Sequence, residues 1–277
     1  MEINNNGPDS RPGNPGVEQE PDRLIKKGYI TVITGPCAVE NWKQLDTIAK
    51  LVKECGLSYM RGGAFKPRTS PYSFQGLGHK GLEYLAEVKR LYGLKTVTEV
   101  TDAERVEEVA KYVDVLQIGT RNMSNFALLK KVGKVASRMN KSVILKRGWS
   151  AAIKEWLLAV EYITMEGDVE VVLCERGIRT FETYTRFTLD LSAVPVIKKM
   201  SNLPIIIDPS HSSGQSDLVV PMSRAAISVG ADGLIVEIHN DPEKALCDGQ
   251  QALNRHQTKE MLNQVEYMAK FFNKKIR

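Results

Sequence analysis

Few cysteines, no long apolar run and no block of basic residues occur in this 277-residue sequence, and each absence excludes a class of protein. Four scattered cysteines are too few for a disulfide framework in a chain of this length. No stretch approaches about 18 consecutive apolar residues, which excludes a transmembrane helix candidate. The 38 lysines and arginines exceed the 33 acidic residues, but they are spread along the chain and form no nucleic-acid-binding stripe. We therefore expect a cytoplasmic protein that binds neither membranes nor nucleic acids.

The first 23 residues differ in composition from the rest of the chain. They hold four of the twelve prolines, three glycines and almost no large apolar side chain. Such a segment cannot offset its ordering entropy by burial, and it lacks the apolar stretch of a signal peptide. We expect a flexible N-terminal tail over residues 1–23, followed by a single domain over residues 24–277.

From Tyr29 onward, short β-branched runs alternate with longer segments of helical period, a pattern typical of βα units and a parallel sheet. Eight such runs in about 250 residues, with no GxGxxG after the first, favour an α/β fold of the (β/α)8 TIM-barrel type over a doubly wound sheet. The expected strands are residues 29–34, 57–62, 95–100, 115–119, 142–146, 170–175, 203–208 and 233–238. The expected helices include 41–55, 80–92, 102–112, 150–166, 217–230 and 256–275.

Charged or metal-binding residues stand at the carboxyl ends of these strands, where a barrel of this type carries its active site. Any one of them alone is more commonly a solvated surface group, but their recurrence strand after strand argues for a site. Convergent arginines and lysines need an anion, and the arginine fork suits phosphate and carboxylate. The sequence therefore predicts a cationic cup for a phosphorylated acid. The strand-end residues include Cys37, Arg61, Glu99, Arg121, Lys146, Arg147, Glu175, Arg176, Asp208, His211, Glu237 and His239.

A metal site is the second prediction from the strand ends. Cys37, His211 and Glu237 offer a thiolate, an imidazole and a carboxylate from the first, seventh and eighth strands, and Asp248 offers a fourth donor from a glycine-flanked loop. This mixed set suits Mn, Fe, Co or Zn without choosing among them. The alternative is a core cysteine, a helix-capping histidine and two surface acids. Two placements of Cys247 stay open: its thiol lies near Cys37 and can form a disulfide with it, or its side chain points away.

Seven segments in this order resemble the 3-deoxy-D-arabino-heptulosonate 7-phosphate (DAHP) synthases of the type I beta branch. They are GPCAVE (35–40), RGGAFKPRTSPYSFQG (61–76), IGTRNMSN (118–125), LKRG (145–148), CERGIRTFET (174–183), DPSHSSG (208–214) and VEIHNDPEKALCDGQQAL (236–253). The resemblance runs from about residue 28 to about residue 255. Too few residues stand between the expected tail and the first strand for a regulatory ferredoxin-like domain, and none remain for one after the expected last helix. We therefore expect a catalytic barrel without a regulatory domain and no feedback inhibition of this chain alone by aromatic amino acids.

The resemblance implies a transferase of the shikimate pathway, which condenses phosphoenolpyruvate with erythrose 4-phosphate and water to DAHP and phosphate. For that reaction we expect Lys66 to serve as proton donor or shuttle, with Glu99 as the weaker candidate for holding the water. The resemblance also implies a homodimer or homotetramer, with a separately encoded regulatory partner as an open possibility. The implied metal ligands are Cys37, His211, Glu237 and Asp248, of which Cys37 and His211 also count as catalytic. The implied phosphoenolpyruvate contacts are Arg61, Lys66, Arg121, Lys146 and Arg176, and the implied sugar-phosphate contacts are Pro67, Arg68 and Thr69.

Two other functions remain open. The first is a 3-deoxy-D-manno-octulosonate 8-phosphate synthase, which has the same fold but takes arabinose 5-phosphate. That family carries an Asn-containing KANR-like segment where this chain reads KPRTS at residues 66–70, which favours the four-carbon acceptor. The second is a non-catalytic phosphate-binding barrel, and a missing metal ligand or several missing cup residues would have supported it.

Overall fold

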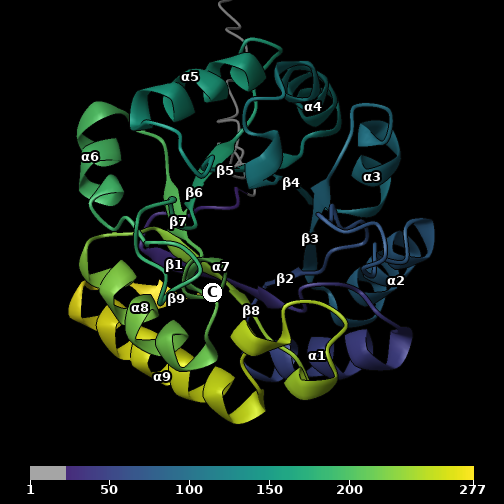
Figure 1. Ribbon diagram of the computed structural model, residues 1–277, viewed down its shortest axis with the longest axis vertical. Coiled ribbons are helices and arrows are strands. Elements are labelled where there is room, and N and C mark those ends of the chain that lie inside the picture. Colours follow the sequence, from purple (N-terminus) through teal and green to yellow (C-terminus); the bar gives the residue numbers. More distant parts are fainter. Residues whose placement is uncertain (1–22) are drawn as a thin grey trace, which may run out of the picture.

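The computed structural model describes residues 23–277, in which eight parallel strands close into a barrel inside a ring of helices (Figure 1). The strands follow one another in chain order from β2 to β8, and β1 pairs with both β8 and β2 to close the ring. The predicted (β/α)8 TIM barrel is confirmed. The predicted tail, residues 1–23, lies outside the described residues except for Arg23. Within residues 23–277, no helix is both long enough and apolar enough to cross a membrane.

The barrel strands coincide with the expected apolar runs to within two residues at each end. Their side chains alternate between two cores, as the pleat of a strand requires. In β1, Ile33 belongs to the core inside the barrel, whereas Val32 belongs to the core between strands and helices. The strands are β1 (Tyr29–Gly35), β2 (Tyr59–Arg61), β3 (Lys95–Val100), β4 (Val115–Ile118), β5 (Ser142–Lys146), β6 (Val171–Glu175), β7 (Ile205–Ile207) and β8 (Gly233–Glu237).

Capping residues mark the ends of several helices. Asn41 caps the first helix by accepting a hydrogen bond from the Gln44 N–H, and Asn254 caps the last in the same way from the Gln257 N–H. Gly93 ends the second helix in the left-handed region, which costs glycine little. The helices are α1 (Trp42–Glu54), α2 (His79–Tyr92), α3 (Val106–Tyr112), α4 (Phe126–Met139), α5 (Ile153–Thr164), α6 (Ala193–Met200), α7 (Pro209–Ser213), α8 (Ser216–Ser228) and α9 (Arg255–Phe271).

The end of the chain corrects one expectation. The helix expected over residues 256–275 ends at Phe271, and Lys275–Ile276 form a short strand, β9, parallel to β1. Asn273 adopts a positive φ of 55°, which turns the chain back toward the barrel. The Arg277 guanidinium then donates to the Tyr59 hydroxyl at 2.7 Å. The basic residues at the C-terminus therefore lie beyond α9, and Arg277 contacts the amino-terminal end of the barrel.

Candidate active site

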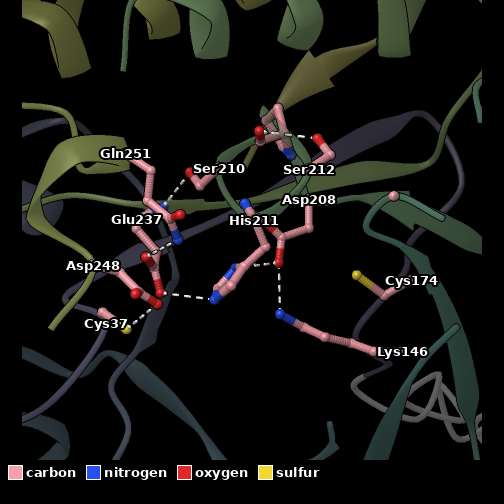
Figure 2. A network of polar contacts seen from close by, with 12 residues as sticks. Cys37, Lys146, Cys174, Asp208, Ser210, His211, Ser212, Glu237, Asp248 and Gln251 are labelled. Carbon is pink, nitrogen blue, oxygen red and sulfur yellow. Dashed lines mark hydrogen bonds and ion pairs between the residues drawn. The ribbon is translucent and has the colours of Figure 1, made fainter. Parts of the chain in front are cut away.

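Four potential metal ligands meet at the carboxyl-terminal mouth of the barrel (Figure 2). Cys37 follows β1, His211 lies in α7, Glu237 ends β8, and Asp248 precedes a 3₁₀ turn, Gly249–Gln251. One ligand atom from each lies within 4.8 Å of the others. Cys37 and Glu237 are buried, whereas His211 and Asp248 are half-buried. The structure thus brings together the whole donor set predicted from the sequence.

Asp208 orients the histidine. Its carboxylate caps α7 by accepting from the His211 backbone N–H at 2.9 Å, and its Oδ2 lies 2.8 Å from His211 Nδ1. The same oxygen accepts from the Lys146 ammonium at 2.6 Å. The other ring nitrogen of His211 then faces Glu237, 3.3 Å from its Oε1 (Figure 2). A carboxylate behind a histidine is the usual arrangement around a metal-binding imidazole. Burial lowers the pKa of His211, which favours the neutral, ligating form.

Glu237 is a buried carboxylate with three polar neighbours besides His211. Arg61 Nη1 lies 2.6 Å from its Oε1, and Gln251 Nε2 donates to its Oε2 at 2.7 Å. Its backbone N–H donates to the Ser210 hydroxyl at 3.0 Å, which ties β8 to α7. Burial raises the pKa of Glu237, but the charges of His211 and Arg61 outweigh it and lower the pKa overall. The group is therefore ionised at neutral pH.

Asp248 adopts a left-handed backbone conformation, with φ of 51°, at the start of its turn. Gly249 must follow, because a Cβ there would lie 2.2 Å from the Pro242 carbonyl oxygen. Oδ2 of Asp248 lies 3.4 Å from Cys37 Sγ and 3.4 Å from Arg186 Nη1. Burial raises the pKa of Asp248, yet the charge of Arg186 and other nearby cations lower it to about 2.

A second thiol lies beside the cluster. Cys37 Sγ is 3.3 Å from Cys247 Sγ, so Cys247 points toward Cys37 rather than away from it. Lys66 Nζ donates to Cys37 Sγ at 3.1 Å, and Arg68 donates to Cys247 Sγ. The hydrogen bond to Cys247, together with burial, raises the pKa of Cys37. Burial lowers the pKa of Lys66, but the charge of Cys37 outweighs it and the pKa rises overall, so Lys66 is an ammonium.

The donor set fits a divalent cation. One sulfur, one imidazole nitrogen and two carboxylate oxygens converge from four separate segments, and such a mixed set suits Mn, Fe, Co or Zn without choosing among them. A buried and a half-buried carboxylate so close to one another need a cation between or beside them. The surrounding lysines and arginines supply part of that charge, and a metal ion would supply the rest.

A cavity of about 410 Å³ opens beside these ligands, and we call it the cup. All of the predicted substrate-contacting residues line it, together with Glu99, His211 and Asp248. The Glu99 side chain passes close to Gly119 on its way to the wall. A Cβ at residue 119 would lie 2.0 Å from Glu99 Oε1, so glycine is needed there. The predicted residues in the wall are Arg61, Lys66, Pro67, Arg68, Thr69, Arg121, Lys146 and Arg176.

Sequence reasoning missed several residues of the cup and placed three others in it wrongly: Arg147, Glu175 and His239, whose Nε2 lies 3.5 Å from Glu40 Oε1. Trp149, Arg179 and Arg186 line the cavity from loops, beyond the strand ends that were searched. The sequence did carry a signal for two of them, because Arg179 and Arg186 follow Arg176 in the segment after β6. Arg147 and Glu175 stand at strand ends but do not line the cavity, because they pair with each other at 3.0 Å on the other side of the strands.

Comparison with known proteins agrees with this architecture. Residues 17–273 match the DAHP synthetase I family. The chain is 53% identical over 255 residues to the phospho-2-dehydro-3-deoxyheptonate aldolase of Thermotoga maritima, covering 92% of this chain and 74% of that protein. The 2-dehydro-3-deoxyphosphooctonate aldolase of Desulfotalea psychrophila is 32% identical over 264 residues, covering 88% of this chain and 91% of that protein.

Solved structures give the same result. The crystal structure of the Thermotoga maritima DAHP synthase has a TM-score of 0.87 and 51% sequence identity, covering 92% of this chain and 73% of that one. A truncated form of 3-deoxy-D-arabino-heptulosonate 7-phosphate synthase from the same organism has a TM-score of 0.84 and 48% identity, covering 92% of each chain.

Proposed function

The chain belongs to the DAHP synthetase I family, and we propose that its cup joins phosphoenolpyruvate to erythrose 4-phosphate, with water, to give DAHP and inorganic phosphate. The enzyme is a transferase, a DAHP synthase of the shikimate pathway. The observation that carries the site assignment is the juxtaposition of a four-donor metal cluster with a cavity walled by arginines and lysines.

The cations of the wall hold phosphoenolpyruvate. Arg176 is 4% exposed, and among the described residues no hydrogen-bond partner lies at its Nη1. Leaving a buried guanidinium nitrogen without a partner is costly, so its position facing the cup favours an anionic ligand. The guanidinium also lies 4.1 Å from the centre of the Phe187 ring, which fixes its plane. Arg61, Arg121 and Lys146 complete the set that orients the phosphate and carboxylate.

Erythrose 4-phosphate takes the outer part of the cup. Pro67, Arg68 and Thr69 belong to one loop after β2, between Lys66 and the exposed rim. The Arg68 guanidinium, which donates to Cys247 Sγ, and the exposed Thr69 side chain both line the cavity, where they can contact a sugar phosphate. Such charge-assisted contacts bind a phosphate and leave the aldehyde end pointing inward, toward the donor cluster.

The chemistry joins C3 of phosphoenolpyruvate to the aldehyde carbon of the sugar. When bound by Cys37, His211, Glu237 and Asp248, a divalent ion supplies Lewis acidity toward the aldehyde oxygen. Water adds at C2, and phosphate then departs with cleavage of the C–O bond. Lys66, held as an ammonium beside Cys37, donates the proton that the new hydroxyl needs, and Glu99 holds the water and accepts its proton.

The nearest alternative substrate is arabinose 5-phosphate. The octulosonate aldolase relative is 32% identical, against 53% for the heptulosonate aldolase, and KPRTS at residues 66–70 favours the shorter acceptor. A non-catalytic barrel would tolerate loss of a ligand, and within the described residues all four ligands are present. A homodimer or homotetramer, a separately encoded regulatory partner and a cytoplasmic location stay predictions.

The experiment is an acceptor comparison with product identification. The purified chain, loaded with Mn²⁺, is incubated with phosphoenolpyruvate and either erythrose 4-phosphate or arabinose 5-phosphate, and the product is identified by NMR. We expect DAHP and a preference in kcat/KM of about 100-fold or more for the four-carbon sugar. Equal or faster turnover of arabinose 5-phosphate would assign the octulosonate reaction, and turnover of neither would favour the non-catalytic barrel.

A further inference from the structure

Gln251 lies in the second layer around the donor cluster, where the proposed reaction gives it no role. The side chain is buried, with 2% of the residue exposed. Its Nε2 donates to Glu237 Oε2 at 2.7 Å, and its Oε1 accepts from Arg186 Nη1 at 2.9 Å. The same Arg186 nitrogen lies 3.4 Å from Asp248 Oδ2. One arginine and one amide therefore connect the two carboxylates of the cluster (Figure 2 shows Gln251 beside Glu237).

Arg186 is held by backbone contacts between two motifs. It belongs to the loop between β6 and α6, and its N–H donates to the Ser213 carbonyl at 3.0 Å. The next residue, Phe187, donates to the Ser212 carbonyl at 2.8 Å. Gly214 follows with φ of 72°, and a Cβ there would lie 2.7 Å from the Arg186 Cβ. The end of the DPSHSSG motif therefore packs closely against the loop that contains Arg186.

A glutamine suits this position because its amide has both a donor and an acceptor end. The donor end faces a carboxylate and the acceptor end faces a guanidinium, so the amide cannot be flipped without losing both contacts. With Oε2 of Glu237 occupied in this way, Oε1 is the oxygen that faces His211 Nε2, at 3.3 Å. The contact therefore selects one rotation of the Glu237 carboxylate.

We propose that Gln251 and Arg186 are positioning residues that hold the Glu237 and Asp248 carboxylates in the orientation that binds a divalent metal ion. This rests on the proposed function, because it takes the four-residue cluster as the metal site. Outer-layer hydrogen bonds of this kind tune metal affinity by about 10–100-fold. Gln251 does not line the cup and acts through the ligands, whereas Arg186 lines the cup and also faces Asp248.

The test measures Co²⁺ binding by the full chain without substrate, in competition with a chelator, using the absorbance of the cobalt–thiolate bond as the signal. We expect Gln251→Met to weaken Co²⁺ binding by about 10–100-fold while circular dichroism and the melting temperature stay near those of the parent. At saturating Co²⁺, kcat and the KM for phosphoenolpyruvate should return toward parental values. Gln250→Met is the matched control, because Gln250 is exposed and neighbours the same turn, and it should leave binding unchanged.

Arg186→Lys provides a second variant should Gln251→Met fold poorly. It keeps a positive charge near Asp248 but loses the fork that reaches Gln251, so we expect about a tenfold loss of Co²⁺ affinity. Parental Co²⁺ affinity in both variants would overturn the positioning role. A parent chain that binds no Co²⁺, or that binds it equally well after Cys37→Ala, would instead overturn the metal site on which the proposal rests.

Discussion

Two groups of charged residues lie on opposite faces of the same strand ends, and they differ in whether acids or cations are in excess. Arg147 forms a closed cluster with Glu175 and Asp190, with its Nη1 at 3.0 Å and 2.8 Å from their carboxylates. The neighbouring residues Lys146 and Arg176 face the cup, where cations outnumber the nearby acids. Because successive residues of a strand point to opposite sides, one residue step separates a cluster in which two acids share one cation from an anion-binding wall.

The difference separates structural charge from functional charge. A buried ion pair whose members satisfy each other contributes little by itself, but loss of one member leaves the other buried and uncompensated. A buried cation without a protein partner lowers stability until a ligand arrives. Substitutions in the closed cluster should therefore change stability, whereas substitutions in the cup and its donor cluster should change activity.

The largest effect is expected from Cys37→Ala. Loss of the thiolate ligand should remove the metal ion and lower kcat/KM by about 10³-fold or more, because Lewis-acid catalysis supplies several kcal/mol. The melting temperature of the metal-free chain should change little. Cys55→Ala is the control, since Cys55 is half-buried behind α1 and far from the cup. Parental turnover by Cys37→Ala would show that the cluster does not serve the reaction.

The closed cluster should show the opposite behaviour. Arg147→Met leaves Glu175, which is fully buried, and Asp190 without their cation, and should lower the free energy of unfolding by about 3–5 kcal/mol. Urea denaturation measures this change. If the folded fraction of Arg147→Met retains the kcat of the parent, the cluster serves stability rather than catalysis. An Arg147→Met chain as stable as the parent would contradict the structural role of the cluster.

Arg176→Met should change activity with little loss of stability. It removes a buried guanidinium that has an unsatisfied nitrogen, so the free energy of unfolding should stay within about 1 kcal/mol of the parent or rise. The KM for phosphoenolpyruvate should rise and kcat/KM should fall by about 100-fold. Steady-state kinetics and a melting curve of the same preparation measure both effects. A large loss of stability with an unchanged KM for phosphoenolpyruvate would show that Arg176 has a structural role, like Arg147.

The smallest effect concerns the thiol pair. In the metal-free chain, the hydrogen bond from Cys37 lowers the pKa of Cys247, burial raises it and Lys66 lowers it, to a final value of about 7. Because the thiolate attacks during disulfide formation and forms as pH rises through the pKa, mild oxidation should join Cys37 to Cys247 about tenfold faster at pH 8 than at pH 6. Mass spectrometry maps the bond. Cys247→Ser should not form it, and a rise approaching about 100-fold over the same interval, as a thiol with an ordinary pKa of 9.0 would give, would refute the lowered pKa.

The sequence predicted the barrel well because each strand is a short apolar run that is bounded by turns, and strand ends of a parallel barrel share one face. It predicted the four metal-ligand candidates because three of them stand at or just after strand ends, which share that face. It failed for β9, whose two residues are strand only because the chain returns to β1. It also missed Arg186 and Gln251, because their positions depend on loop contacts between distant segments rather than on local periodicity.

A crystal structure of the full chain with Mn²⁺ and phosphoenolpyruvate, using anomalous scattering at the manganese edge, tests the central claim most directly. We expect one strong anomalous peak among Cys37, His211, Glu237 and Asp248, with an oxygen of phosphoenolpyruvate bound to the Arg176 guanidinium. A manganese ion held elsewhere, or phosphoenolpyruvate bound outside the cup, would contradict the assignment of the open, cationic face as the catalytic one.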